Sequence, residues 1–156
     1  MPADDFVPMI APHSFLFFED LAVGQRASLT RVAAGDELER FAEPGVAAGA
    51  DPPADAPALA GAFGQGIAYG MFTAGLVSAV LGTKLPGRGA VFLSQNLQFL
   101  APVGAGDSVT AQVEVIELVP ARRRARLFCE CVCDGKVVLE GEAWIALAAR
   151  EARPGA

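Results

Sequence analysis

Histidine and cysteine are scarce in this sequence. Its 156 residues contain one His and three Cys, and the three Cys lie together in CECVC as Cys129, Cys131 and Cys133. An odd number of Cys at this spacing does not form a disulfide framework. On a strand, Cys residues two apart share a face but stand about 6.6 Å apart, too far for two thiolates of one tetrahedral zinc. We therefore expect three buried thiols that pack as apolar groups, and no metal site.

Positive charge is also scarce. Twelve Lys and Arg against eighteen Asp and Glu give a net charge of −6. Proteins that bind nucleic acid rely on basic patches, so this balance argues against nucleic acid as a partner. The apolar run at 67–83 has 17 residues, fewer than the ~20 of a membrane span. No basic start precedes an apolar run at the N-terminus, so we expect a cytoplasmic protein with no signal peptide and no membrane contact.

The length fits one domain with a sizeable core. Residues 1–14 carry three prolines and no apolar periodicity, which indicates an extended arm. The single histidine, His13, lies in this arm and is expected to be solvated. We assign residues 15–149 to the domain and residues 150–156 to a frayed tail.

Apolar periodicity in the domain predicts an α+β fold. We expect strands at 15–25, 26–32, 90–100, 108–118, 123–133 and 136–147, a short helix at 36–42 and a long helix at 67–81. The long helix is apolar around its circumference, so other structure must enclose it, and Gly82 is placed to cap its C-terminus. Asp134-Gly135 predicts a hairpin. The expected architecture is a curved antiparallel sheet wrapped around one central helix, with exposed edges that could pair with a second copy.

Several segments together resemble the MaoC-like hydratases. They are FFEDLAVGQR, FGQGIAYGM, VLGTKLPGRGAVFLSQNLQFLAPVGAGDSV and VLEGEAWI, which spread over residues 16–147. The resemblance implies a single hotdog fold and a dimer whose interface holds a thioester tunnel. It implies addition or removal of water on an acyl-CoA or acyl-carrier-protein thioester, with no cofactor. It also implies oxyanion donors at the backbone N–H groups of Gly70 and Met71, where a helix N-terminus suits developing negative charge.

The segment 43–66 departs from that family. It contains no Lys, Arg or His, although the family carries its catalytic loop, G-D-x-N-P-x-H, just before the central helix. The ungapped alignment puts Val46 at the Gly position, Ala47 at Asp, Gly49 at Asn, Ala50 at Pro and Pro52 at His. Neither Ala47 nor Pro52 can transfer a proton, so the expected catalytic pair is absent.

Other residues could act in its place. Asp51 is adjacent to the His position at Pro52, and Asp55 lies one residue past the second acidic position of the family, although Asp in such a loop often only forms turns. Tyr69 could donate a hydrogen bond to a carbonyl, or simply be half-buried with its hydroxyl on the backbone. Substrate binding is assigned to Gly64 and to arginines that could meet CoA phosphates or form a solvated face, namely Arg88, Arg122, Arg123 and Arg124.

Three functions are compatible with the sequence. The first is a hydratase or dehydratase that uses displaced catalytic groups. The second is a catalytically silent protein that binds an acyl thioester or serves as the partner subunit of a dyad-bearing chain. In the latter case the dimer would be a heterodimer instead of the expected homodimer. The third is another hotdog activity such as a thioesterase, which usually needs a carboxylate near the central helix, whereas residues 66–83 contain none.

Overall fold

One antiparallel sheet and one long helix make up the part of the chain that the computed structural model describes, residues 16–33 and 70–150. The sheet has five strands in the order β1-β3-β4-β5-β2. The elements are η1 (Phe18–Asp20), β1 (Arg26–Val32), α3 (Gly70–Thr83), β2 (Val91–Phe99), β3 (Ser108–Val119), η2 (Pro120–Arg122), β4 (Arg124–Cys133) and β5 (Lys136–Ala146). The predicted helix at 36–42 and the loop at 43–66 lie outside the described residues.

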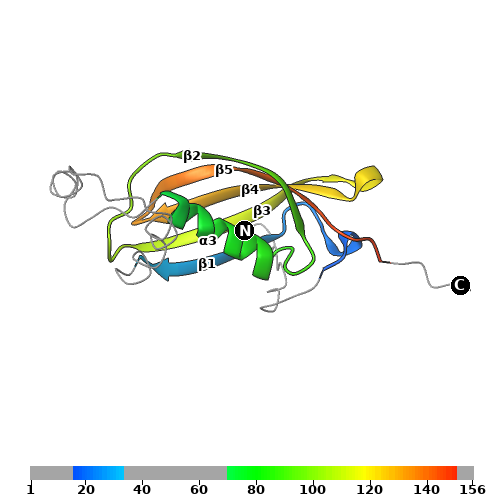
Figure 1. Ribbon diagram of the computed structural model, residues 1–156, viewed down its shortest axis with the longest axis horizontal. Coiled ribbons are helices and arrows are strands. Elements are labelled where there is room, and N and C mark those ends of the chain that lie inside the picture. Colours follow the sequence, from blue (N-terminus) through cyan, green and yellow to red (C-terminus); the bar gives the residue numbers. More distant parts are fainter. Residues whose placement is uncertain (1–15, 34–69, 151–156) are drawn as a thin grey trace, which may run out of the picture.

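The helix α3 lies across one face of the curved sheet (Figure 1) and contacts β1, β3 and β4. This is the predicted α+β arrangement, and the five strands expected from 26–32 and from 90 onward are all present. Within the described ranges, no helix is long and apolar enough to cross a membrane.

The core lies between α3 and the sheet face that it covers. The alternation predicted for β3 is confirmed, because every second residue is buried at 2% exposure or less, namely Val109, Ala111, Val113 and Val115. Val77, Val80 and Leu81 of α3 meet this face and are fully buried. Each such side chain contributes about 1.5–3 kcal/mol through its removal from water, so this face holds the helix on the sheet.

The three cysteines are buried, as predicted. Burial raises the pKa of Cys129 and of Cys131 to about 12, because the low-dielectric core disfavours the thiolate. A thiol is nucleophilic as its thiolate, so these two side chains act as small apolar groups of the core.

The strand predicted at 15–25 is wrong, because the 3-10 helix η1 occupies part of this stretch. Here side chains form the hydrogen bonds with backbone groups that a neighbouring strand would form in a sheet. The Phe17 N–H donates to the Asp20 carboxylate at 2.9 Å, and the Gln25 side chain bonds the Ala22 N–H and the Asp20 carbonyl, both at 3.0 Å. The turn predicted at Gly24 is present, with φ of 96°.

The predicted cap at Gly82 is also wrong, because α3 continues to Thr83. The Thr83 hydroxyl donates to the Ala79 carbonyl at 2.6 Å, and the Lys84 N–H donates to the Val80 carbonyl at 2.9 Å. The left-handed glycines of this turn are Gly87 and Gly89 instead, and Gly87 has φ of 85°. Its N–H donates to the Leu81 carbonyl at 3.0 Å.

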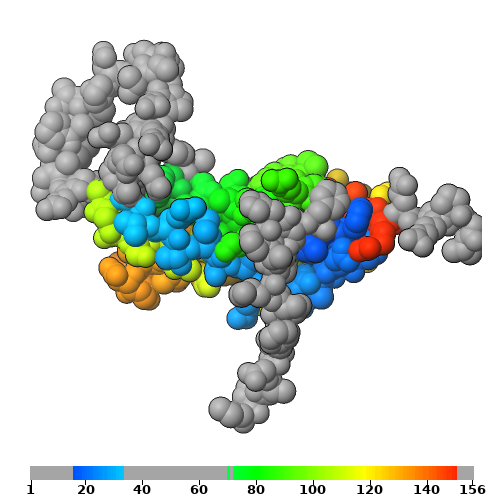
Figure 2. All heavy atoms as spheres, turned by 90° about the horizontal axis from the view of Figure 1, so that it is seen from below, coloured from blue at the N-terminus to red at the C-terminus, as the bar shows by residue number. Residues whose placement is uncertain are grey.

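The prediction that α3 is enclosed on all sides fails along one stripe of small residues. Gly75, Ser78 and Gly82 are exposed, and α3 reaches the molecular surface beside β1 (Figure 2). Glycine and serine present little apolar surface, so an apolar composition did not require full enclosure here.

The hairpin predicted at Asp134-Gly135 is confirmed. Both residues have positive φ, 49° and 73°, as a type I′ turn requires. This turn sets the β4–β5 pairing, and β2 then adds to the far side of β5. The edges of the sheet are therefore β1 and β2.

Candidate functional site

A cavity of about 310 Å³ opens beside the first residue of α3. Three segments form its wall: the start of α3, the end of β2 with the turn that follows it, and β5. The lining residues are Gly70, Thr73, Phe99, Leu100, Ala101, Pro102, Val103 and Val138. Most of them are apolar, which is typical of a small-molecule site with few polar groups.

Backbone hydrogen bonds hold the β2 side of this cavity in place. The N–H groups of Leu100 and Ala101 both donate to the Val138 carbonyl, at 2.9 and 3.3 Å. The ring of Phe99 lies so close to Gly70 that a Cβ built on the glycine would stand 3.1 Å from a ring carbon. A glycine at the start of α3 therefore lets an aromatic ring approach the helix terminus closely.

The electrostatics of this helix end favour negative charge. The first backbone N–H groups of a helix lack intrahelical partners and carry part of the helix dipole. The first turn of α3 contains no acidic residue that would offset this charge. Thr73 also lines the cavity, at 4% exposure, and brings a hydroxyl to an otherwise apolar wall. The cavity can therefore accept an apolar group whose carbonyl oxygen gains negative charge.

The structure describes only some of the residues that the sequence assigns to the site. Gly70 lines the α3 cavity, and the backbone of Met71 follows it in the first turn. Six further residues lie outside the described residues and remain predictions: Ala47, Asp51, Pro52, Asp55, Gly64 and Tyr69. Arg88 is exposed in the turn between α3 and β2.

Seven of the eight cavity residues were not predicted from the sequence, among them Thr73, Phe99 and Val138. Thr73 could have been found, because positions three apart on a helix share a face and Gly70 was already assigned to the site. Phe99 and Val138 could not, because their positions depend on the pairing of β2 with β5, in which Phe99 lies opposite Leu139.

The three consecutive arginines that the sequence assigns to substrate binding, Arg122, Arg123 and Arg124, lie in two environments. Arg122 and Arg124 line a second cavity of about 470 Å³, together with Leu93, Ser94, Val119 and Trp144. Arg123 ends η2 in the left-handed conformation, with φ of 51°, and is exposed.

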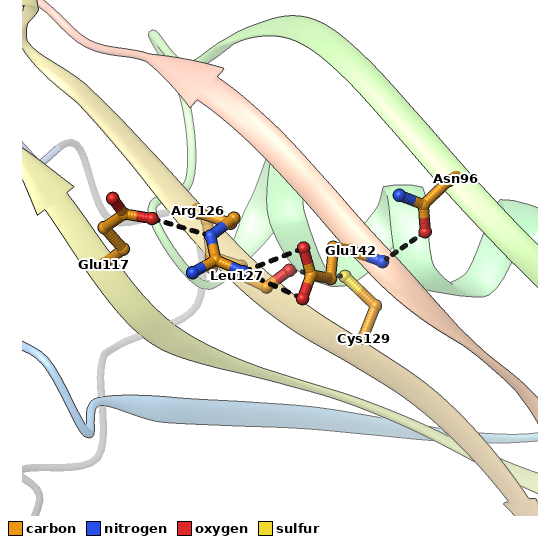
Figure 3. Close-up of polar contacts among 6 residues, drawn as sticks. All are labelled: Asn96, Glu117, Arg126, Leu127, Cys129 and Glu142. Atoms are coloured by element: carbon orange, nitrogen blue, oxygen red, sulfur yellow. Dashed lines mark hydrogen bonds and ion pairs between the residues drawn. The ribbon is translucent and has the colours of Figure 1, made fainter.

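Arg126 joins three strands on the outer face of the sheet. Its guanidinium bonds Glu117 at 2.8 Å and both carboxylate oxygens of Glu142 at 2.9 Å (Figure 3). These two carboxylates raise the pKa of Arg126. The Glu142 N–H donates to the Asn96 side-chain oxygen at 3.2 Å, which extends the network to β2. Arg126 is therefore committed to holding strands together.

A third cavity, of about 290 Å³, contains polar side chains that bond one another. Arg26 pairs with Glu114 at 3.1 Å, and Gln112 bonds Glu130. These side chains already have partners within the cavity wall, so we do not assign a substrate to it.

The described residues include one group with metal-ligating atoms, formed by Asp107, Cys133 and Asp134, whose ligand atoms lie within 4.8 Å of one another. The Asp107 carboxylate already accepts the Gly104 N–H at 2.8 Å within its turn. We therefore assign Asp107 to the formation of this turn and do not assign a metal to the group.

Comparisons with known proteins give a consistent family. The family model "MaoC like domain" matches residues 54–127. A 3-hydroxybutyryl-CoA dehydratase of Methylorubrum extorquens is 47% identical over 138 residues, 87% of this chain and 87% of the relative. An (R)-specific enoyl-CoA hydratase of Rhodospirillum rubrum is 41% identical over 152 residues, 96% of this chain and 99% of the relative.

Solved structures agree with these relatives. The R-hydratase PhaJ1 from Pseudomonas aeruginosa superimposes with a TM-score of 0.78 at 32% identity, covering 94% of this chain and 99% of its own. The (R)-hydratase from Aeromonas caviae gives 0.73 at 36% identity, covering 83% of this chain and 98% of its own.

Proposed function

This chain belongs to the MaoC-like family of hotdog-fold hydratases and dehydratases, and from that premise we propose that it binds an acyl thioester in the α3 cavity and adds water to it or removes water from it. The observation that carries the proposal is the cavity at Gly70, which combines an apolar wall with the start of a helix whose described first turn holds no acidic residue. The two relatives with the sequence identities given above are an enoyl-CoA hydratase and a hydroxybutyryl-CoA dehydratase.

In the proposed arrangement, the thioester carbonyl oxygen accepts the backbone N–H groups of Gly70 and Met71. When water adds across the α,β double bond, negative charge develops on this oxygen, and fixed donors stabilise it in the transition state. The acyl chain packs against the apolar wall that Phe99 and Val138 provide. A proton must then leave the attacking water and reach the α carbon, which requires an acid–base group. In our proposal Asp51, Asp55 or Tyr69 supplies that group.

A second candidate is a silent subunit that binds the thioester without converting it. The observation in its favour is Ala47 and Pro52 at the positions where the family pattern has Asp and His. Such a chain would work as the partner of a dyad-bearing subunit. Hydration of crotonyl-CoA by the purified chain, followed as loss of the enoyl absorbance, separates the candidates: turnover supports the enzyme, and binding at background turnover supports the silent subunit.

We also propose that β2 pairs with a second chain. Edge strands in monomers are usually blunted by charged residues, whereas β2 contains none. It exposes large apolar side chains, among them Val91 at 59% and Phe99 at 53%. A homodimer would cover this edge, and so would a heterodimer with a dyad-bearing subunit.

Two glycines of α3 provide a matched test of the thioester site. In Gly70→Ala the new methyl group stands 3.1 Å from the Phe99 ring, so the ring must move and the cavity wall changes. In Gly75→Ala the methyl group meets nothing within 4 Å. We expect the unmodified chain to bind crotonyl-CoA at micromolar concentration, Gly70→Ala to bind it several-fold more weakly, and Gly75→Ala to bind it unchanged.

Calorimetric titration measures all three proteins under the same conditions. Equal affinity in the three would show that the thioester does not lie at the start of α3. No affinity in any of them would contradict both candidate functions.

A further inference from the structure

The second cavity joins residues that are far apart in the sequence. Sheet pairing brings Ser94 opposite Trp144, and Arg124 opposite Val119 on one side and Ala146 on the other. Arg122 reaches the same cavity from η2, and Leu93 from β2. We propose that this cavity binds a nucleotide phosphate, with the phosphate on Arg122 and Arg124 and the base against Trp144.

In the described part of the chain, no neighbouring carboxylate pairs with the positive charge of this cavity. Within residues 16–33 and 70–150, no carboxylate forms an ion pair with Arg122 or Arg124. The nearby carboxylates of Glu117 and Glu142 are already bonded to Arg126. Two guanidinium groups therefore line one cavity without such a partner in the described part of a chain whose net charge is −6. The planar fork of arginine matches phosphate oxygens, so a phosphate would relieve the repulsion between the two cations.

The aromatic part of the cavity is held in place before any ligand arrives. Arg126 lies over the Trp144 ring, 5.8 Å from its centroid, and two carboxylates fix Arg126 in turn. Aromatic side chains bind nucleobases by stacking, whichever base is present. Leu93 and Val119 add apolar surface to the cavity, which an inorganic phosphate ion would not contact favourably. A volume of about 470 Å³ suits a small organic ligand better than an inorganic ion.

The second cavity, which we call the arginine cavity after Arg122 and Arg124, is separate from the cavity at the start of α3, because the two lie at opposite ends of β2. Leu93 and Ser94 near its start line the arginine cavity, and Phe99 at its end lines the α3 cavity. The required chemistry occurs in free nucleotides and also in CoA, whose nucleotide end carries a 3′-phosphate. An acyl carrier protein presents no nucleotide.

The test is a titration of the full chain with ADP, adenosine 3′,5′-bisphosphate, CoA, adenosine and inorganic phosphate. We expect the nucleotides to bind at least about tenfold more tightly than adenosine or phosphate alone, because each of these makes only one of the two contacts. Preference for CoA and the 3′,5′-bisphosphate over ADP identifies CoA as the source, and equal affinity for ADP identifies free nucleotides. Phosphate that binds as tightly as the nucleotides would overturn the assignment.

Variants locate the binding. Arg122→Gln combined with Arg124→Gln should weaken nucleotide binding about 10- to 100-fold, because charged hydrogen bonds to phosphate are lost. Arg31→Gln removes the same kind of charge from an exposed position on β1 and should leave the affinity unchanged. If Arg31→Gln weakens nucleotide binding as much as the double variant does, the effect arises from the net charge of the chain, and the proposed site is refuted.

The unmodified chain provides a second readout that does not depend on the folding of any variant. Trp144 is the single tryptophan of the sequence, so intrinsic tryptophan fluorescence reports on this cavity alone. Nucleotide binding should change that emission with the same Kd that calorimetry gives. Binding with no change in emission would place the nucleotide elsewhere. Crotonyl-pantetheine, which lacks the nucleotide, tests the α3 cavity separately and should leave the emission unchanged.

Discussion

Gly141 is the position where a single methyl group should do most damage. A Cβ on this residue of β5 would stand 1.9 Å from the Asn96 carbonyl oxygen and 3.0 Å from the Leu97 Cα. An ordinary contact needs at least 3.4 Å, and the atoms in the way belong to the backbone of β2 rather than to a flexible side chain. In Gly141→Ala the two strands must therefore separate locally by about 1.5 Å, a distance at which a hydrogen bond of about 2.9 Å is lost.

The expected loss of stability follows from the hydrogen bonds between β2 and β5 that this separation breaks. Losing two to four ladder hydrogen bonds at about 1 kcal/mol each, with about 1–3 kcal/mol of overpacking, lowers the free energy of unfolding by about 3–7 kcal/mol. That is a large part of the roughly 5–15 kcal/mol typical of a domain, and it corresponds to a fall in Tm of about 10 °C or more. Because β2 forms a wall of both cavities, we also expect weaker binding of crotonyl-CoA and of nucleotides.

Chemical and thermal unfolding of Gly141→Ala beside the unmodified chain measures this effect. Gly75→Ala is the control, since it adds the same methyl group to an exposed helix position with nothing within 4 Å. It should be neutral or stabilising by up to about 1 kcal/mol, because alanine favours helix over glycine. A Gly141→Ala protein with the denaturation midpoint of the unmodified chain would refute the close approach of β2 to β5.

Three further predictions concern catalysis, assembly and the core. Ala47→Asp combined with Pro52→His should raise crotonyl-CoA hydration, and either change alone should do little, because a catalytic pair acts as a unit; an unmodified chain that turns over as fast as the double variant contradicts the silent loop. Sedimentation at micromolar concentration should show a species of twice 16.1 kDa, and a monomer alone would exclude pairing through β2. Cys129 and Cys131 should resist alkylation at pH 8 until the chain unfolds. Their folded pKa of about 12 exceeds the ordinary value of 9.0, so the unfolded chain releases these two protons at a lower pH than the fold does. The contribution of the two thiols to the free energy of unfolding should therefore be constant below pH 9 and fall as the pH rises from 9 toward 12, which denaturant titration measures.

Local patterns were sufficient for much of the fold. The alternation along β3 predicted its buried face, and Asp134-Gly135 predicted the turn between β4 and β5, because both depend on residues close in sequence. The prediction for segment 15–25 is wrong for the opposite reason. Its apolar residues suggested a strand, whereas the Asp20 carboxylate accepts the Phe17 N–H and the Gln25 side chain donates to the Asp20 carbonyl, and these bonds stabilise η1.

The sequence alone was also enough to predict that the start of α3 belongs to the site, since the resemblance to the MaoC-like hydratases implies oxyanion donors at Gly70 and Met71. Only the tertiary structure decided what surrounds it. The strand β2 follows α3 in sequence but pairs with β5, the last strand, and this crossover brings Phe99 and Val138 to Gly70. The same pairing brings Ser94 to Trp144, whereas the pairing of β4 with β3 and β5 places Arg126 in an ion-pair network with Glu117 and Glu142. Strand order and register arise from packing between distant segments, so the residues of one strand cannot specify them.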